Sequence, residues 1–167
     1  CLVGSEMCIR DRCKVGTMRP LILVGGGGHC KSVIEAAESK GLVIGGILDL
    51  PENVGERILN YPVIGTDNDI PHLVSDFDFI VTLGFIKAPF LRIRLHERIE
   101  AAGGRLATVI ASTAHVSQHA TVQYGTVILH HACVNAGASI GKGCIINTFA
   151  NIEHDALIGD YCHISTG

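Results

Sequence analysis

A histidine between two carboxylates is the strongest candidate for chemistry in this chain. His154 stands between Glu153 and Asp155. An imidazole has a reference pKa of about 6.5, so it can accept a proton near neutral pH, and an adjacent carboxylate stabilises the protonated ring. Either Glu153 or Asp155 can do this, and spacing alone does not choose between them. The triplet therefore predicts a general base.

A second candidate is the glycine loop Gly25-Gly26-Gly27-Gly28-His29. It follows an apolar run at Leu21–Val24 and precedes a helical pattern over Lys31–Lys40. Backbone N–H groups at a helix start favour phosphate. Because Cys30 stands where the full dinucleotide fingerprint has glycine, the loop is a weak signal for NAD. A tight turn without a ligand is the alternative, but four glycines exceed what a turn requires, which favours a phosphate-bearing ligand.

Two more candidates stand at the ends of expected strands. Asp49 ends the apolar run Val43–Asp49, and Gly84 follows the run Phe77–Leu83. Strands that alternate with helices indicate a parallel sheet with right-handed crossovers, and ligands bind at the carboxyl ends of such strands. We therefore expect residues 18–104 to form a small Rossmann-like domain, with Asp49 and Gly84 beside the glycine loop.

The rest of the chain, residues 105–167, repeats every six positions. An Ile or Val recurs at 110, 116, 122, 128, 134, 140, 146, 152, 158 and 164, and a Thr, Ala or Cys stands two places before each. A period of six is typical of a parallel β-helix, in which three hexapeptides form one triangular coil. A β-sandwich would show period-two patterning instead. The aliphatic residue should point into the prism and the small residue should lie near a corner.

The repeat places the candidate histidines on different sides of this prism. His154 follows inward-pointing Ile152 by two places, where other repeats hold residues such as Gln118 and Lys142. A solvated corner is therefore the alternative to catalysis, and spacing alone does not separate the two. His163 follows nine residues later, about half of a coil. One site that uses both histidines would then need two subunits.

Composition excludes several classes. The net charge of −3 and the absence of a basic stripe argue against nucleic acid as a partner. No apolar run approaches the roughly 20 residues of a membrane span. Seven cysteines form no disulfide framework, which indicates a reduced, cytoplasmic protein.

Both ends of the chain carry expectations. Residues 1–17 lack any periodicity that matches their neighbours and resemble translated vector sequence, so we expect a non-native or disordered leader and a start at Met18. The repeat stops at Gly167 in the middle of a hexapeptide, without the polar cap that a solenoid needs. We therefore expect the β-helix to be incomplete at its C-terminal end.

Four segments together carry a family resemblance: VGGGGHCKSV, ILD, VTLG and NTFANIEHDALIGDYCHISTG. The chain resembles the sugar O-acyltransferase family of hexapeptide-repeat acyltransferases. That family includes sialic-acid O-acetyltransferase-like proteins and bacterial N-acetyltransferases acting on UDP-4-amino sugars. The resemblance implies a nucleotide-sugar domain, a left-handed β-helix, a homotrimer, and acetyl-coenzyme A as donor without a metal. Its expected activity is transfer of an acetyl group to an amino or hydroxyl group of a sugar, in cell-surface polysaccharide biosynthesis.

The resemblance also assigns roles to residues. It implies that His154 is the general base and that Asp155 supports it. His29 would lie at the acceptor sugar and His163 would contact acetyl-coenzyme A. The nucleotide-sugar pocket would be lined by Gly27, Gly28, Asp49 and Gly84. Leu50 and Phe85 depart from the family's pattern.

Three other classes compete with this interpretation. A metal hydratase of the γ-carbonic-anhydrase type also uses a left-handed β-helix, but its zinc needs three histidines. The adjacent pair His130-His131 would diverge on a strand, and the chain has no two histidines five positions apart. A non-catalytic nucleotide-sugar-binding protein would keep the glycine loop without using His154. A Rossmann oxidoreductase lacks the third glycine, at Cys30.

Overall fold

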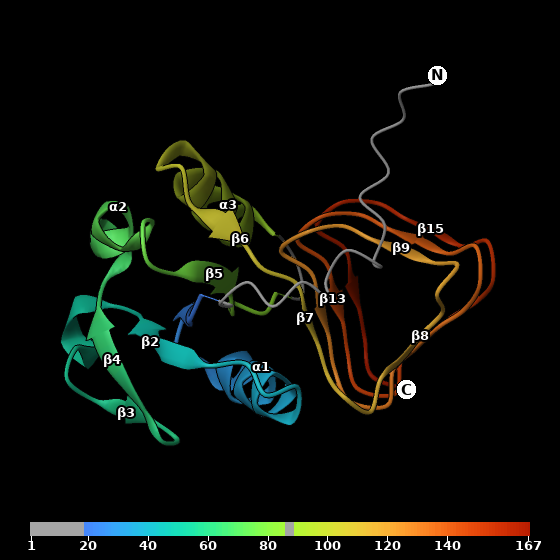
Figure 1. Ribbon diagram of the computed structural model, residues 1–167, viewed down its shortest axis with the longest axis horizontal. Helices are drawn as coiled ribbons and strands as arrows, with labels where there is room; N and C mark the ends of the chain where they lie inside the picture. Colours follow the sequence, from blue (N-terminus) through green and yellow to red (C-terminus); the bar gives the residue numbers. More distant parts are fainter. Residues whose placement is uncertain (1–18, 86–88) are drawn as a thin grey trace.

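The computed structural model describes residues 19–85 and 89–167. An α/β region and a triangular prism of short strands lie side by side, and both are drawn in Figure 1. The leader predicted over 1–17 lies outside the described residues. No described helix has the length and apolar character that crossing a bilayer demands.

The α/β region is built on one sheet in the order β3-β4-β2-β1-β5-β6. Its strands are β1 (Leu21–Val24), β2 (Ile44–Leu48), β3 (Arg57–Ile58), β4 (Tyr61–Gly65), β5 (Asp78–Val81) and β6 (Arg105–Leu106). All neighbours pair in parallel except β3, which pairs antiparallel with β4. The predicted parallel sheet is confirmed. The short β3–β4 hairpin was not predicted, because its turn uses Leu59 at φ +52° rather than a glycine.

Three α-helices accompany the sheet: α1 (Gly28–Ser39), α2 (Ile70–Leu73) and α3 (Phe90–Ala101). Short 3₁₀ turns, η2 (Pro51–Asn53) and η3 (Asp67–Asp69), follow β2 and β4. Helix α1 starts three residues earlier than the pattern from Lys31 predicts, so Gly28 and His29 belong to its first turn. Gly41, at φ +71°, ends the helix as expected.

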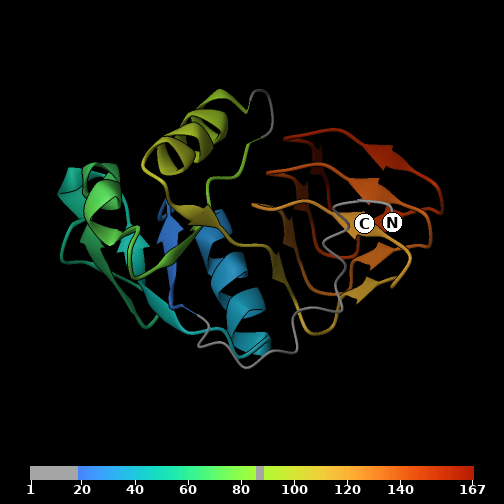
Figure 2. The same cartoon turned by 45° about the horizontal axis from the view of Figure 1, so that its top comes forward.

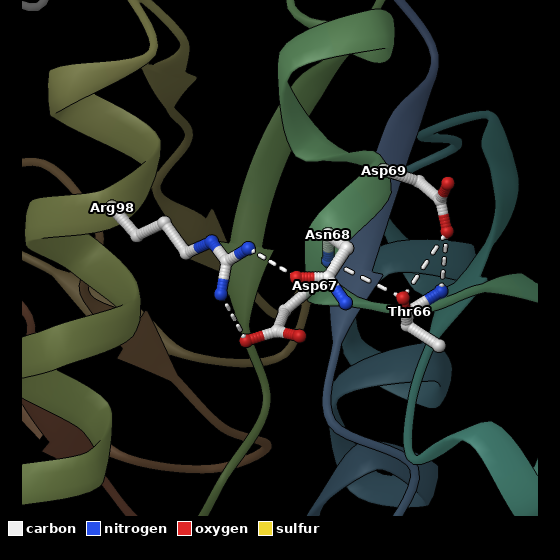
Figure 3. Close-up of polar contacts among 5 residues, drawn as sticks. All are labelled: Thr66, Asp67, Asn68, Asp69 and Arg98. Atoms are coloured by element: carbon white, nitrogen blue, oxygen red, sulfur yellow. Dashed lines mark hydrogen bonds and ion pairs between the residues drawn. The ribbon is translucent and has the colours of Figure 1, made fainter.

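An ion pair on the exposed side of α3 fixes this helix to the sheet region (Figure 3). The Arg98 guanidinium donates to the Asp67 carboxylate and to the Asn68 side-chain oxygen, each at 2.7 Å. Thr66 and Asp69 form a reciprocal capping box on η3. The segment that receives Arg98 is therefore itself held in place, and α3 is supported on the side away from the prism.

The prism consists of ten two-residue strands in three parallel sheets, ordered β16-β13-β10-β7, β14-β11-β8 and β15-β12-β9. The strands are β7 (Val109–Ile110), β8 (His115–Val116), β9 (Thr121–Val122), β10 (Val127–Ile128), β11 (Cys133–Val134), β12 (Ser139–Ile140), β13 (Ile145–Ile146), β14 (Asn151–Ile152), β15 (Leu157–Ile158) and β16 (His163–Ile164). Each strand pairs with the one three hexapeptides later, for example Ile128 with Ile146. The predicted left-handed β-helix is confirmed.

The core of the prism follows the repeat. The second residue of each strand points inward, and the central ones are buried: Ile128, Val134, Ile140, Ile146 and Ile152. Small residues two places before inward positions are buried in the same cluster, namely Ala132, Ala138, Cys144 and Ala150. Each buried Ile or Val contributes on the order of 1.5–3 kcal/mol. Stacking of these equivalent positions is what holds successive coils together.

One side of the prism is covered by the α/β region. Val109, Val127 and Ile145 point outward from β7, β10 and β13, yet all are fully buried. The first two share a core cluster with residues of α1, which lies against this side (Figure 2). The apolar residues at these outward positions therefore join the two regions. In the next coil of the same side, the outward position holds His163.

Candidate active site

A cleft of about 710 Å³ opens where the α/β region meets the covered side of the prism. It is lined by Gly28, His29, Ser32, Gly84, Phe85, Asn147 and His163. These residues come from the start of α1, the segment after β5, and the strands β13 and β16 with their flanks. Four predicted site residues, Gly28, His29, Gly84 and His163, therefore lie around one cleft.

His29 presents a partly buried imidazole, neutral near pH 7, to this cleft. Burial lowers its pKa to about 4, with the positive Arg92 and the neighbouring His163 acting in the same direction. Its Nε2 atom is buried and has no hydrogen-bond partner among the described residues. A buried polar atom without a partner is costly, so a polar group of a bound ligand would stabilise this arrangement.

His163 is held by contacts from both regions of the molecule. Its Nδ1–H donates to the Phe85 carbonyl oxygen at 2.5 Å, and its Nε2 lies 3.3 Å from the Asn147 side-chain nitrogen. The Phe85 ring packs edge-on against the imidazole, with ring centroids 5.5 Å apart. Because Nδ1 donates, Nε2 of the neutral ring is an acceptor. Phe85 supports the ring through its backbone and its side chain.

The four glycines of the loop divide into two pairs. A Cβ at Gly25, which lies at φ +109°, would collide with Leu83, and a Cβ at Gly26 would collide with the Asp49 carboxylate. Packing accounts for this pair. Around Gly27 and Gly28 there is open space, and Gly27 caps α1 without a side-chain hydrogen bond. The first N–H groups of α1 are therefore accessible to an anion.

Asp49 lies beside the loop rather than in the lining of the cleft. Its carboxylate accepts a hydrogen bond from the Asn53 side chain at 2.7 Å and lies against Gly26. This places the carboxylate at the carboxyl edge of β2, as predicted, next to the glycine loop.

His154 lies in the turn between β14 and β15, away from the cleft lining. Its Nδ1–H donates to the Asp155 carboxylate at 2.8 Å, and the side chains are 77% and 80% exposed. This hydrogen bond, followed by the charge of Asp155, raises the pKa of His154. The Glu153 carboxylate instead accepts from the Asn151 side chain at 2.6 Å. Of the two carboxylates that spacing allows, the structure pairs Asp155 with the imidazole.

Asp155 adopts φ +60°, in the left-handed region that favours glycine. One coil earlier, the same corner holds Gly137, and a Cβ there would collide with the Asp155 carboxylate. The glycine therefore makes room for this carboxylate. The backbone conformation alone is not distinctive, because His131, Phe149 and Tyr161 adopt it at other corners.

The two candidate histidines of the prism lie on different sides, as their spacing predicts. His163 belongs to the sheet β16-β13-β10-β7, whereas His154 lies between strands of the other two sheets. Within one chain, His29 and His163 thus line the same cleft, whereas the imidazole–carboxylate pair of His154 and Asp155 lies apart from it.

Three lining residues were not predicted as site residues: Ser32, Phe85 and Asn147. Ser32 follows Gly28 by one helical turn, so placing the helix start at Gly28 would have found it on the same face. Asn147 carries no signal of its own, because its role depends on the approach of His163 from the next coil.

The histidines considered for a metal site have other contacts. His130 Nδ1 lies 2.7 Å from the Thr113 hydroxyl, and the His131 ring stacks on Phe149 at 4.9 Å between centroids. Among residues 19–85 and 89–167, no group of three or more His, Cys, Asp or Glu side chains is arranged to hold a metal ion. Cys30, at the position of the missing glycine, is fully buried in α1, and burial raises its pKa to about 11.

Comparisons with known proteins address both regions. The sequence model of the family described as the PglD N-terminal domain matches residues 20–99. A histidine-to-asparagine mutant of perosamine N-acetyltransferase from Caulobacter crescentus, solved with CoA and GDP-perosamine, is 30% identical; the match covers 90% of this chain and 69% of that one, with a TM-score of 0.79.

The acetyltransferase domain of PglB from Neisseria gonorrhoeae, solved with acetyl coenzyme A, is 34% identical to the chain. The match covers 90% of this chain and 72% of that one, with a TM-score of 0.81. The comparison with curated proteins finds no match.

Proposed function

We propose that this chain, which belongs to the hexapeptide-repeat family of sugar acetyltransferases, transfers the acetyl group of acetyl-coenzyme A to the amino group of a nucleotide-linked sugar. The choice of an amine is supported by the similarity to a perosamine N-acetyltransferase. The open glycines at the start of α1 support a phosphate-bearing acceptor.

The hydrogen-bonded pair His154–Asp155 is the observation that carries this proposal. Because Nδ1–H donates to Asp155, Nε2 of the neutral ring has a free lone pair. As the amine attacks the thioester carbon, a C–N bond forms, and Nε2 accepts a proton from the nitrogen. The C–S bond then breaks and the coenzyme A thiolate leaves. The Asp155 carboxylate stabilises the imidazolium that forms.

The cleft supplies the groups that would bind the two substrates. In this proposal the glycine loop and His29 hold the nucleotide sugar, and Asp49 lies close enough to the loop to contact its ribose. His163 contacts the acetyl-coenzyme A. Since His29 and His163 line the same cleft, the amine and the thioester would meet there.

The separation of His154 from the cleft supports a site shared between subunits. A general base works best where water is excluded, yet the His154 side chain is 77% exposed in one chain. A second copy that covers this corner with its own cleft would bring the base to the acceptor. We propose a homotrimer, in which each of three equivalent interfaces forms one such site.

The test is release of coenzyme A from acetyl-coenzyme A, measured with a thiol reagent over a panel of acceptors. The panel contains UDP- and GDP-linked 4-amino sugars, the same nucleotide sugars with hydroxyl in place of the amine, and sialic acid. We expect turnover with an amino sugar and none with its hydroxyl analogue. Turnover only with hydroxyl acceptors would contradict N-acetylation. Binding of a nucleotide sugar without any coenzyme A release would favour the non-catalytic alternative.

A further inference from the structure

Arg92, in the first turn of α3, is a buried guanidinium with an unusual set of partners. Its side chain is 1% exposed, and its described hydrogen-bond partners are all backbone carbonyl oxygens. Burial lowers its pKa to about 10, which leaves it charged at neutral pH. A buried charge is costly unless hydrogen bonds satisfy it, so this arrangement calls for an explanation.

The four carbonyl groups belong to two different regions. Nη1 donates to Val81 at 2.6 Å and to Leu83 at 3.1 Å, at the end of β5. Nε donates to Gly143 at 2.7 Å and Nη2 to Gly125 at 3.2 Å, both at corners of the prism. One guanidinium thus links the segment that leads to Gly84 and Phe85 with two successive coils.

The corners that accept these hydrogen bonds are shaped for close approach of α3. Gly125 and Gly143 adopt φ +70° and +65°, and a Cβ at either would collide with a neighbouring side chain, His96 on α3 in the first case and Tyr161 in the second. Glycine at both corners therefore lets α3 lie close enough for Arg92 to reach the carbonyl groups.

Both linked segments contribute residues to the lining of the cleft. The segment after Leu83 supplies Phe85, whose carbonyl oxygen accepts the hydrogen bond from His163 Nδ1. The coil after Gly143 supplies Asn147, which lies against His163 Nε2. The relative position of these two segments decides which nitrogen of His163 donates a hydrogen bond and which one accepts.

We propose that Arg92 is a positioning residue: by binding four carbonyl groups, it sets the Phe85 segment against the prism and so holds His163 in the tautomer with hydrogen on Nδ1. The effect of Arg92 on catalysis depends on the function proposed above, whereas its effect on the tautomer of His163 does not. Lysine cannot replace arginine here, because an ammonium group lacks the planar fork of donors needed to span both regions.

The test compares Arg92→Lys with Arg94→Lys, a substitution at an exposed position of the same helix. Nitrogen-15 NMR of the full chain near pH 8 reports the tautomer of each histidine, and His163→Gln identifies the His163 signals. We expect hydrogen on Nδ1 of His163 in the wild type and in Arg94→Lys. In Arg92→Lys we expect a mixture that includes the Nε2–H tautomer.

Turnover provides a second measurement. We expect the KM for acetyl-coenzyme A to rise about tenfold in Arg92→Lys, with kcat changed much less, because the substitution disturbs a binding contact. A folded Arg92→Lys protein with an unchanged His163 tautomer would overturn the proposal. So would failure of both Arg92→Lys and Arg92→Gln to fold, because Arg92 would then be needed for stability alone. If the tautomer shifts in a protein without acetyltransferase activity, the positioning role stands and only the proposed function is wrong.

Discussion

The covered side of the prism and the corner that carries His154 differ in how many contacts a single chain provides to the histidine located there. On the covered side, His163 has hydrogen-bond contacts on both ring nitrogens, and its neighbours come from both regions. At the corner, His154 is bonded to Asp155 and is otherwise largely exposed. One chain therefore contains a cleft lined by residues of both regions and, apart from it, an exposed pair of side chains that we propose to be catalytic.

The pKa values of the histidines follow the same division. Burial lowers the pKa of His29 to about 4 and that of His96 to about 3, because both side chains, from α1 and α3, lie where the α/β region meets the prism. The hydrogen bond that His154 donates to the Asp155 carboxylate raises the pKa of the exposed His154. Burial thus favours the neutral form of His29 and His96. At the exposed corner, the imidazole of His154 can take up a proton.

Replacing His154 tests the corner with the largest expected effect. We expect His154→Ala to reduce kcat by about 10²- to 10⁴-fold, the usual contribution of a general base. Because the side chain is exposed, the free energy of unfolding should hardly change. The measurements are steady-state coenzyme A release and denaturant unfolding, with His72→Ala as a control at another exposed histidine. Near-normal turnover in His154→Ala would remove the base assignment.

Acid should destabilise the covered side through His96. Its pKa is about 6.5 in the unfolded chain and about 3 in the folded protein, because burial and the positive Arg92 and Lys142 oppose protonation. Between these values the unfolded state binds more protons, so the free energy of unfolding falls as the pH falls. The contribution is at most about 1.4 kcal/mol per pH unit.

Urea unfolding from pH 7 to pH 4 measures how steeply the free energy of unfolding changes with pH, which we call the slope. We expect His96→Leu to reduce it, since both ring nitrogens of His96 lack partners among the described residues and an apolar side chain can fill the site. His29 acts in the same direction, so part of the slope should remain. An identical slope in wild type and His96→Leu would show that His96 does not stay neutral in the fold.

Asp155→Asn tests which of the two carboxylates beside His154, the proposed base, supports the imidazole. Loss of the charge should lower the pKa of His154, so the acidic limb of the profile of kcat/KM against pH should move to lower pH. We also expect kcat to fall by about tenfold or more, because the imidazolium loses its stabilising partner. Glu153→Gln is the matched control, since Glu153 bonds to Asn151 instead. The assignment is wrong if Glu153→Gln shifts the profile and Asp155→Asn does not.

The smallest expected effect is on substrate binding at the covered side. His163→Ala should raise the KM for acetyl-coenzyme A by about tenfold and leave kcat within a few-fold, because a contact made before and during the reaction is lost. His115→Ala changes the outward residue of β8, on another side of the prism, and should leave both constants unaltered. A loss confined to kcat would instead give His163 a role in the chemical step.

The sequence predicts those parts of the fold that depend on repetition or on local backbone chemistry. An inward Ile or Val every six residues predicts the prism, and glycines between a strand and a helix predict the phosphate-accessible start of α1. The pairing of His154 with a neighbouring carboxylate is also local. Outward Val109, Val127 and Ile145 recur every 18 residues and mark the covered side, a signal that becomes clear only once the sheet order is known.

The remaining features depend on contacts between regions. Arg92, Arg94 and Arg98 look alike in the sequence, yet only the approach of two prism corners makes the first of them buried. Asn147 joins the site because His163 lies beside it in the next coil. Such roles arise from tertiary packing, so neither propensity nor periodicity could identify them.

Mixed oligomers of two variants test most directly whether one site combines the cleft of one subunit with His154 of another. His154→Ala lacks the proposed base and keeps the cleft, whereas His29→Ala has an altered cleft and keeps the base. Each variant alone should be nearly inactive. After unfolding and refolding together, a shared site predicts recovery of activity at interfaces that combine the intact base of one subunit with the intact cleft of another, about a quarter of the sites in an equal mixture. No recovery from two well-folded, mixed variants would contradict a site built from two subunits.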